Sequence, residues 1–420
     1  MSAEKNTSKK ISRREMLKLS AFAGAGAIIG ASGLGAVTAL SDGFGASSEK
    51  TAASGNMDKQ GIVPFHGKHQ AGIVTPQQTN AYIAAFTLTT SNRQDVISLF
   101  KDWTKLSETL TEGRVNSVDY ANDFIPPADT GESEDLGASN LTITFGLGAS
   151  FFSKKGVDRF GMSSKKPKHL LDIPKMRGED LKEPFIGGDL CVQACADDQQ
   201  VAFHAIRNII KAASGTADIL WLQSGFINGP EGETPRNLFG FKDGTANLSP
   251  KQEAKLDAIV WADEGEPDWM AGGTYMACRK IMMMIEMWDR TSLKSQEDTF
   301  GRKKLSGAGY GKVKEHDAVD TKQMPINAHT RVAKETGQQI YRRAYSYTDG
   351  IDQLTGNMDS GLMFICFQKD PSMQFVPMLK KLAESDALNE YIKHIGSGLF
   401  ACPKGIRKGT YLAQDLFESV

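Results

Sequence analysis

Short apolar runs typical of β-strands alternate along this chain with amphipathic stretches that repeat at the helical period. In the first half the pattern predicts strands over 81–88, 141–147 and 189–196 and helices over 95–106 and 199–212. In the second half it predicts strands over 273–287 and 361–368, followed by a helix over 375–383. Each half is thus a strand–helix–strand unit. We expect an α+β fold of two sheets, each covered by helices, that divides near residue 230.

The first 40 residues have the composition of an export signal. Residues 12–18 (SRREMLK) contain a pair of arginines in the twin-arginine pattern, and an uncharged run rich in Ala and Gly follows over 19–40. This run carries glycines where a membrane-spanning helix would carry leucines, so a signal peptide over 1–40 is favoured over a membrane anchor. Residues 41–64 are rich in small and polar residues without apolar periodicity, and they are predicted to form a flexible linker.

Composition narrows the class of protein without naming a partner. With 420 residues, 40% of them hydrophobic and 24% charged, the chain can bury one large or two medium cores. The formal net charge of −1 gives no sign of nucleic-acid binding. Five cysteines without CxxC spacing argue against a zinc or iron–sulfur site, and Cys191 and Cys195 are interpreted as small buried side chains in a strand.

A twin-arginine signal indicates a protein that folds before export, usually because a cofactor is inserted inside the cell. A metal in such a cofactor would be held by histidine here, and the spacing of the seven histidines does not select one of them. Longer motifs do. The chain contains HQAGIVTPQQ (69–78), GFKDGTANL (240–248), NAHTRVAKE (327–335), YRRAYSY (341–347) and YIKHIGSGLF (391–400). Together these segments resemble the dye-decolourising peroxidases, specifically their EfeB-like branch, and GFKDG matches the GxxDG motif of that family in full.

The resemblance implies two ferredoxin-like domains of the dimeric α/β-barrel type, over 65–230 and 231–420, and one haem b per chain held mainly by the second domain. By position in the motifs, His329 corresponds to the proximal ligand of the haem iron, Asp243 to the distal acid, and Arg342 to the distal arginine that also contacts the haem. Arg343, the second residue of the Arg-Arg pair, is the weaker candidate for the distal arginine.

These residue types suit peroxide chemistry. A neutral imidazole can bind the iron and leave its other face open. Cleavage of hydrogen peroxide needs a group that moves a proton between the two oxygens and a cation for the departing one, roles that fit Asp243 and Arg342. Two other interpretations stay open: Asp243 as a residue of an Asp-Gly turn, and Arg342 as a surface or propionate-pairing arginine. A carboxylate partner for the proximal histidine is expected at Asp386 or Glu390.

The function that follows is peroxide-dependent oxidation of bulky organic reductants or of Fe(II) in an iron-uptake system. The alternative is a haem- or iron-handling protein that releases iron from haem for a permease partner. Across the two hypotheses the ligands are haem and hydrogen peroxide, and iron-permease components are candidate partners. The protein is expected to form a homo-oligomer, namely a dimer. Export would place the protein in the periplasm or on the outer side of the cell envelope.

Overall fold

The computed structural model of the protein describes residues 61–115, 124–230 and 232–418. The predicted signal peptide over 1–40 and most of the predicted linker over 41–64 lie outside the described residues. No helix in the described ranges combines the length and the apolarity that a bilayer crossing requires.

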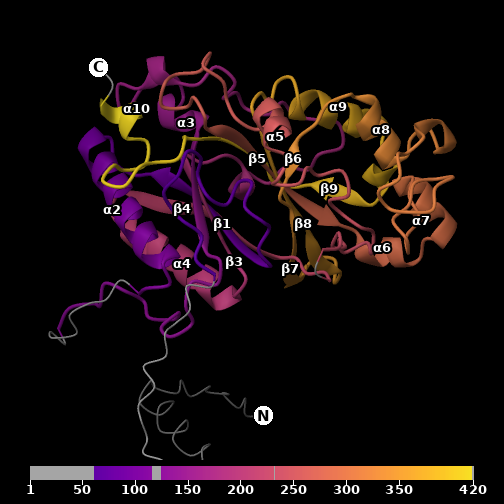
Figure 1. Ribbon diagram of the computed structural model, residues 1–420, viewed down its shortest axis with the longest axis horizontal. Helices are drawn as coiled ribbons and strands as arrows, with labels where there is room; N and C mark the ends of the chain where they lie inside the picture. The colour runs from indigo at the N-terminus through magenta and orange to yellow at the C-terminus, as the bar shows by residue number, and fades with distance from the viewer. Residues whose placement is uncertain (1–60, 116–123, 231, 419–420) are drawn as a thin grey trace, which may run out of the picture. The chain divides into compact units, whose positions relative to one another are not determined.

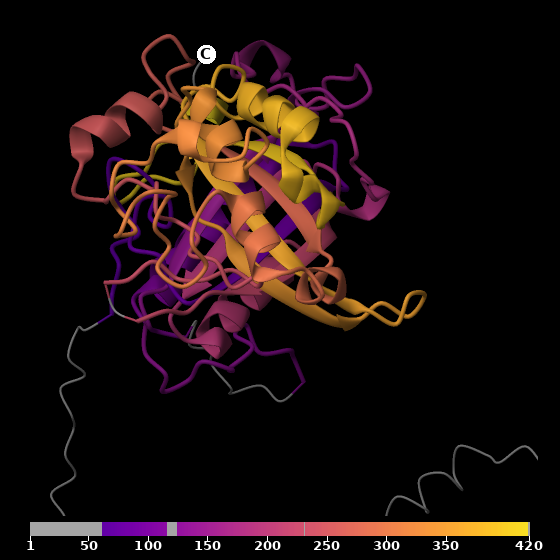
Figure 2. The ribbon, with the colours of Figure 1, turned by 90° about the vertical axis from the view of Figure 1, so that its right-hand side faces the viewer.

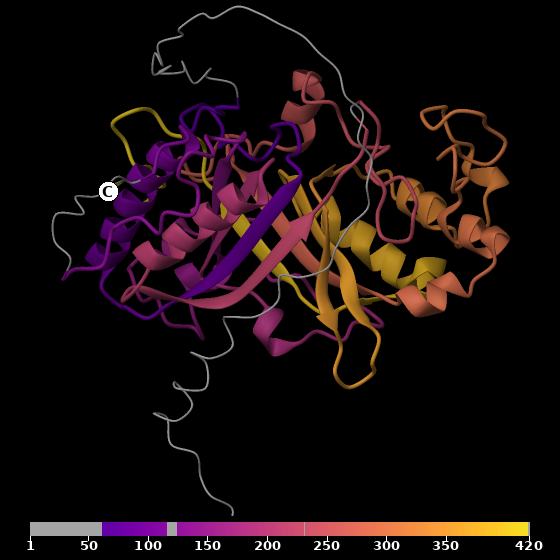
Figure 3. The ribbon, with the colours of Figure 1, turned by 90° about the horizontal axis from the view of Figure 1, so that it is seen from below.

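The first half of the fold has the chain order strand, helix, strand, strand, helix, strand. Its elements are β1 (Asn80–Leu88), α2 (Arg93–Thr111), β2 (Thr142–Gly148), β3 (Leu190–Ala196), α4 (Gln199–Ala212) and β4 (Ala217–Phe226), with the short α3 (Ala149–Phe152), η2 (Ser163–Lys165) and η3 (Glu183–Phe185) between β2 and β3. Side chains cap both long helices: Asn92 accepts a hydrogen bond at the start of α2, and Asp198 accepts two at the start of α4. The two helices lie side by side against the sheet (Figure 3).

The second half has the same kind of order, with more helices between its strands. Its strands are β5 (Thr274–Met283), β6 (Tyr341–Arg342), β7 (Tyr345–Ile351), β8 (Met358–Gln368), β9 (Ile392–His394) and β10 (Gly398–Cys402). Its helices are α5 (Glu253–Ile259), α6 (Ile285–Asp289), α7 (Leu293–Phe300), η4 (Thr321–Gln323), α8 (His329–Glu335), α9 (Phe375–Ser385), η5 (Ala387–Glu390) and α10 (Gln414–Glu418). Helices α8 and α9 pack together at the end of the unit opposite α2 (Figure 1).

Every strand pairing in the sheet is antiparallel, and the strand order identifies the fold. The first half runs β4-β1-β3-β2 and the second runs β7-β8-β5-β10, so each has the order of a ferredoxin-like sheet. The halves join at β4–β7, where Phe226 pairs with Ser346, and at β2–β10, where Phe400 pairs with Gly148. Because β8 also pairs with β5, the described strands close into a ring. The predicted pair of ferredoxin-like sheets is confirmed, whereas the exact domain limits stay a prediction.

Alternate residues of the strands from both halves form one buried cluster inside this barrel, as the period of two along a strand requires. The cluster includes four of the five cysteines, and all five are buried and unbridged. The interpretation of Cys191 and Cys195 as small core residues is therefore confirmed. The β7–β8 hairpin continues past the barrel (Figure 2).

One predicted element is wrong in its extent. The strand expected over 273–287 ends at Met283, and residues Ile285–Asp289 form helix α6. Met283 still pairs with β9, through Ile392, but no ladder partner is available further on in the described chain. The next apolar residues pack in the helical manner, because Trp288 turns inward and is only 2% exposed. The other predicted strands and helices occur within a few residues of their expected limits.

Candidate active site

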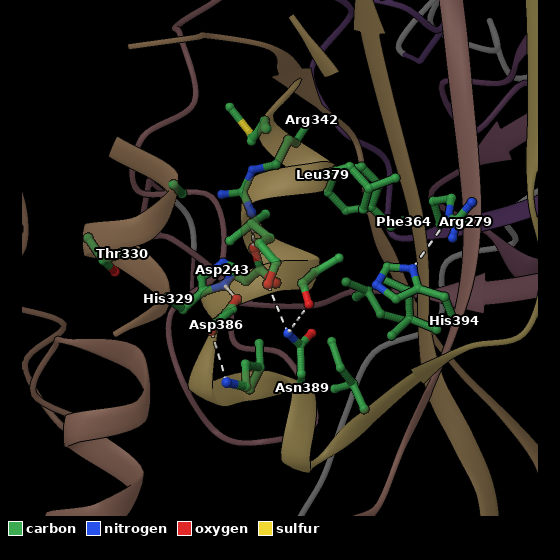
Figure 4. Close-up of a pocket in the computed structure, with 18 of the residues that line it drawn as sticks. Asp243, Arg279, His329, Thr330, Arg342, Phe364, Leu379, Asp386, Asn389 and His394 are labelled. Atoms are coloured by element: carbon green, nitrogen blue, oxygen red, sulfur yellow. Dashed lines mark hydrogen bonds and ion pairs between the residues drawn. The ribbon is translucent and has the colours of Figure 1, made fainter. Parts of the chain in front are cut away.

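A cavity of about 320 Å³ lies against the outer face of the second sheet. Since the even-numbered residues of β5 point into the barrel, its odd-numbered residues point out and line the cavity wall. Helices α8 and α9 and the segment around residues 237–246 close the other sides (Figure 4). Much of the lining is apolar: Ile281, Met283, Phe300, Leu362, Phe364 and Leu379. A cavity of this size and polarity is typical of a cofactor site.

His329 is the first residue of α8, and its side chain faces the cavity. Its Nδ1 lies 2.6 Å from Oδ2 of Asp386, while the other carboxylate oxygen of Asp386 accepts a hydrogen bond from the backbone N–H of Leu388. Asp386 is thus fixed at both oxygens. Glu390, the other carboxylate that the sequence left open, is exposed, so the geometry selects Asp386 as the partner.

Asp386 affects both the pKa of His329 and the nitrogen that carries the hydrogen of its neutral ring. Burial by itself lowers the pKa of His329, but the charge of Asp386 and its hydrogen bond outweigh burial, and the pKa is raised. An ionised carboxylate only accepts hydrogen bonds, so the hydrogen of the neutral imidazole sits on Nδ1. Within the described residues, Nε2 of His329 has no hydrogen-bond partner. Its lone pair is therefore free to bind iron.

Asp243 and Arg342 meet in the same cavity although 99 residues separate them. Nη1 of Arg342 donates to Oδ1 of Asp243 over 2.8 Å. Oδ2 of Asp243 accepts a longer hydrogen bond of 3.3 Å from the side-chain amide of Asn237. Both charged side chains keep partial exposure, 26% for Arg342 and 16% for Asp243, so a small molecule in the cavity can contact either.

The backbone around this pair is fixed by a residue that sequence reasoning missed. The side-chain amide of Asn247 donates to the carbonyl oxygen of Arg342 over 2.8 Å and accepts from its N–H over 2.9 Å. Asn247 thereby pairs with Arg342 as a strand neighbour would, and it ties the loop of Asp243 to β6. Its place four residues after Asp243 in GFKDGTANL is the sequence signal that could have pointed to it. Gly244 has φ +126°, which favours glycine, and the turn that follows is at Thr245 and Ala246, where the N–H of Asn247 donates to the carbonyl oxygen of Gly244.

The far side of the cavity carries a second polar group, with Phe364 and Leu379 between it and Arg342 in Figure 4. The fully buried Arg279 forms an ion pair with Glu179, and its Nε donates to Nδ1 of His394 over 3.3 Å. Burial, with the nearby charge of Arg279, lowers the pKa of His394 to about 3. His394 is therefore neutral at physiological pH.

The lining as a whole fits a haem. Seven Lys/Arg side chains border the cavity against three Asp/Glu among the described residues: Arg177, Lys242, Arg279, Arg302, Lys334, Arg342 and Lys393 against Glu179, Asp243 and Asp386. An apolar cavity with excess positive charge suits a flat apolar ring that bears carboxylates. His329 and His394 are the two histidines in the lining, and of these only His329 keeps a carboxylate-oriented ring with a free nitrogen.

Comparison with known proteins identifies the family. Residues 70–227 match the N-terminal domain model of the Dyp-type peroxidases, and residues 234–407 match the C-terminal one. The chain is 37% identical over 375 residues to the deferrochelatase of Escherichia coli K12, covering 85% of this chain and 86% of the relative.

Solved structures agree with the family models. The ferric form of DtpA from Streptomyces lividans is 38% identical, with a TM-score of 0.78 over 85% of this chain and 97% of the other. A DyP-type peroxidase from Cellulomonas bogoriensis is 35% identical, with a TM-score of 0.77 over 85% of this chain and 98% of the other. The chain therefore belongs to the Dyp-type peroxidase family and is a haem peroxidase, an oxidoreductase.

Proposed function

We propose that the protein binds one haem b per chain, with Nε2 of His329 as the axial ligand of the iron and Asp243 and Arg342 on the peroxide side. The observation that carries this proposal is the meeting of two ion pairs, His329–Asp386 and Arg342–Asp243, in one cavity. The bound haem would supply the iron and the electrons for peroxide reduction.

The chain's own residues would then manage protons and charge. Oδ1 of Asp243 is engaged by Arg342, so Oδ2, with its weaker contact to Asn237, would take a proton from the inner oxygen of peroxide and return it to the outer one. The guanidinium of Arg342 would balance the negative charge that develops on the departing oxygen. Asp386 would keep the ring of His329 oriented and make its Nε2 a stronger donor to iron.

Two classes of reductant and one alternative activity follow from the relatives. Relatives named DyP-type peroxidases support the oxidation of bulky organic compounds, and those named deferrochelatase support iron chemistry, either oxidation of Fe(II) or release of iron from haem. We propose peroxidase turnover as the main activity, because the distal pair of Asp243 and Arg342 has a role in peroxide cleavage and none in removing iron from the ring.

One preparation of haem-loaded protein tests this choice. We expect peroxide-dependent oxidation of an anthraquinone dye, which Asp243→Asn diminishes, and a 1:1 ratio of haem to chain. The same protein is assayed with Fe(II) and peroxide, and for metal-free porphyrin without peroxide. Formation of metal-free porphyrin at an unchanged rate in Asp243→Asn, together with no dye or Fe(II) turnover by the wild type, would favour the alternative.

We propose that the twin-arginine signal exports the folded protein to the periplasm or the outer side of the cell envelope. Replacing Arg13 and Arg14 with lysine is expected to leave folded, haem-containing protein inside the cell, because that pathway reads the arginine pair. Fractionation followed by immunoblotting and haem staining measures this. Lys9→Arg/Lys10→Arg, which keeps the charge and the pair, is the matched control. Unchanged export of the Arg13/Arg14 variant would show that the signal was misread.

We propose iron-permease components as the partners of the exported protein, because iron chemistry suggests them. We also propose that the protein assembles as a homodimer. Co-purification with the permease and the mass in solution test these two proposals separately.

A further inference from the structure

Arg343 is a buried cation next to the distal arginine, and it points the other way. Tyr341 and Arg342 pair with Phe367 and Cys366 of β8, and β7 resumes in the same register when Tyr345 pairs with Met363. Between them the N–H of Arg343 donates to the carbonyl of Ile365. Residues 341–345 therefore follow one strand line, along which neighbouring side chains face opposite sides. Arg342 faces the cavity, whereas Arg343 faces the barrel interior and is 1% exposed.

The guanidinium of Arg343 donates hydrogen bonds to oxygens of residues 75–78 and also contacts the thiol of Cys195 on β3, and all these partners are neutral. Nη1 donates to the carbonyl oxygen of Thr75 over 2.5 Å, and Nη2 donates to the carbonyl of Pro76 and to the side-chain oxygen of Gln78. Within the described part of the chain Arg343 forms no ion pair, and its Nε has no hydrogen-bond partner. A cation buried in this way is costly, and an apolar side chain of similar volume would suit a barrel core better for stability alone.

The same segment reaches the strand at a second point. The side-chain amide of Gln77 donates to the carbonyl oxygen of Ala344 over 2.7 Å. From the cavity side, the amide of Asn247 pairs with the backbone of Arg342. Residues 342–344 are thus held from the second half by the β8 ladder and by Asn247, and from the first half by residues 75–78.

We propose that Arg343 is a positioning residue that aims Arg342 at Asp243 by anchoring its strand to residues 75–78. The proposal rests on the role of Arg342 given above. It explains why a residue outside the cavity carries a buried charge: several directed hydrogen bonds from one planar group define a strand position more narrowly than apolar packing does. The first half of the fold, which supplies few cavity residues, would thereby determine the geometry of the distal pair.

A double-mutant cycle on haem-loaded protein tests this proposal. The variants are Arg343→Met, Arg342→Leu and the double variant, with the rate of the Soret change after mixing with peroxide, the haem content and the KM for dye as readouts. We expect Arg343→Met to slow the peroxide step by about 10-fold, since displacement of a catalytic group by about 1 Å can cost up to about 10²-fold. Haem content and the KM for dye should stay near wild type. In the Arg342→Leu background, Arg343→Met should add almost nothing, because its effect passes through Arg342.

Lys280→Met is the matched control. Lys280 is also a buried cation in the barrel, 6% exposed, but its ammonium group pairs with Asp349 and lies over the ring of Tyr347, further along β7 than residues 342–344. We expect it to lower stability without slowing the peroxide step. If Arg343→Met does not load haem, Arg343→Lys replaces it in the cycle. Lysine keeps the positive charge but can form fewer of the hydrogen bonds, so we expect a peroxide rate between those of the wild type and Arg343→Met.

The outcomes separate the two proposals. Three outcomes would overturn the positioning role of Arg343 and leave the proposed role of Arg342 intact. They are additive effects of the Arg343 and Arg342 substitutions, equal slowing by Lys280→Met, and wild-type peroxide rates in both Arg343 variants. A wild-type rate in Arg342→Leu would overturn the proposed role of Arg342 and this inference with it.

Discussion

Replacing His329 with alanine is expected to abolish stable haem incorporation. In the described cavity, His329 is the histidine with a carboxylate-oriented ring and a free Nε2, and the neutral His394 has its Nδ1 occupied by Arg279. No second histidine in the described lining is therefore placed to replace it as the axial ligand. The measurement is the ratio of Soret to protein absorbance in the purified variant, together with its peroxidase turnover.

Two further variants sharpen the result. His316→Ala removes a histidine whose side chain is 72% exposed and should load haem normally. Asp386→Asn should still bind haem but more weakly, because Asn keeps the size of the side chain but has no charge and only one acceptor oxygen for the N–H groups of His329 and Leu388. Added imidazole should restore part of the Soret band to His329→Ala by occupying the emptied position. An unchanged Soret band and intact turnover in His329→Ala would refute the assignment.

The distal pair is expected to control the reaction with peroxide. Arg342→Leu should slow it by about 10²-fold or more, the usual contribution of one preorganised electrostatic donor. Asp243→Asn keeps the shape of the side chain and removes the base, so a loss of roughly 10² to 10⁴-fold is expected if Asp243 carries the proton. Stopped-flow mixing of haem-loaded protein with peroxide measures both rates. Which residue matters more is itself decided by this comparison.

Arg331→Leu serves as the control for loss of an arginine, because Arg331 pairs with Glu335 on α8 and does not line the cavity. It should react with peroxide at the wild-type rate. If Asp243→Asn and Arg342→Leu also react at that rate while they bind haem normally, the distal site lies elsewhere. A deficit in only one of them would identify that residue as the dominant group.

The periodicity of apolar residues predicted strands β1, β2, β3, β5 and β8 and helices α2, α4 and α9, because burial of one face imposes a period of two or 3.6 on the residues that form it. It failed where that signal is weak. Strand β4 was not predicted, since Ile219 and Leu222 are exposed on it and blur the alternation. The strand predicted over 273–287 ran too far because apolar residues continue into α6. Closure of the barrel was not readable from periodicity at all, because it depends on pairings such as β4–β7 between distant segments.

Sequence motifs identified part of the candidate site, and the rest of it required the fold. The motifs brought His329, Asp243 and Arg342 forward, and the structure places all three in one cavity. Alternation along YRRAYSY separates Arg342 from Arg343, since the tyrosines at 341 and 345 belong to the buried cluster and Arg343 shares their side of the strand. The choice of Asp386 needed the fold, because the two candidate carboxylates are four residues apart and only the path of α9 and η5 brings one of them to His329.

A crystal structure of the haem-loaded protein would test the assignment of these four residues. We expect iron bound to Nε2 of His329, with Asp386 still hydrogen-bonded to Nδ1 and with Asp243 and Arg342 on the opposite face of the ring. Iron bound by any other side chain, or a haem whose open face points away from Asp243 and Arg342, would contradict it.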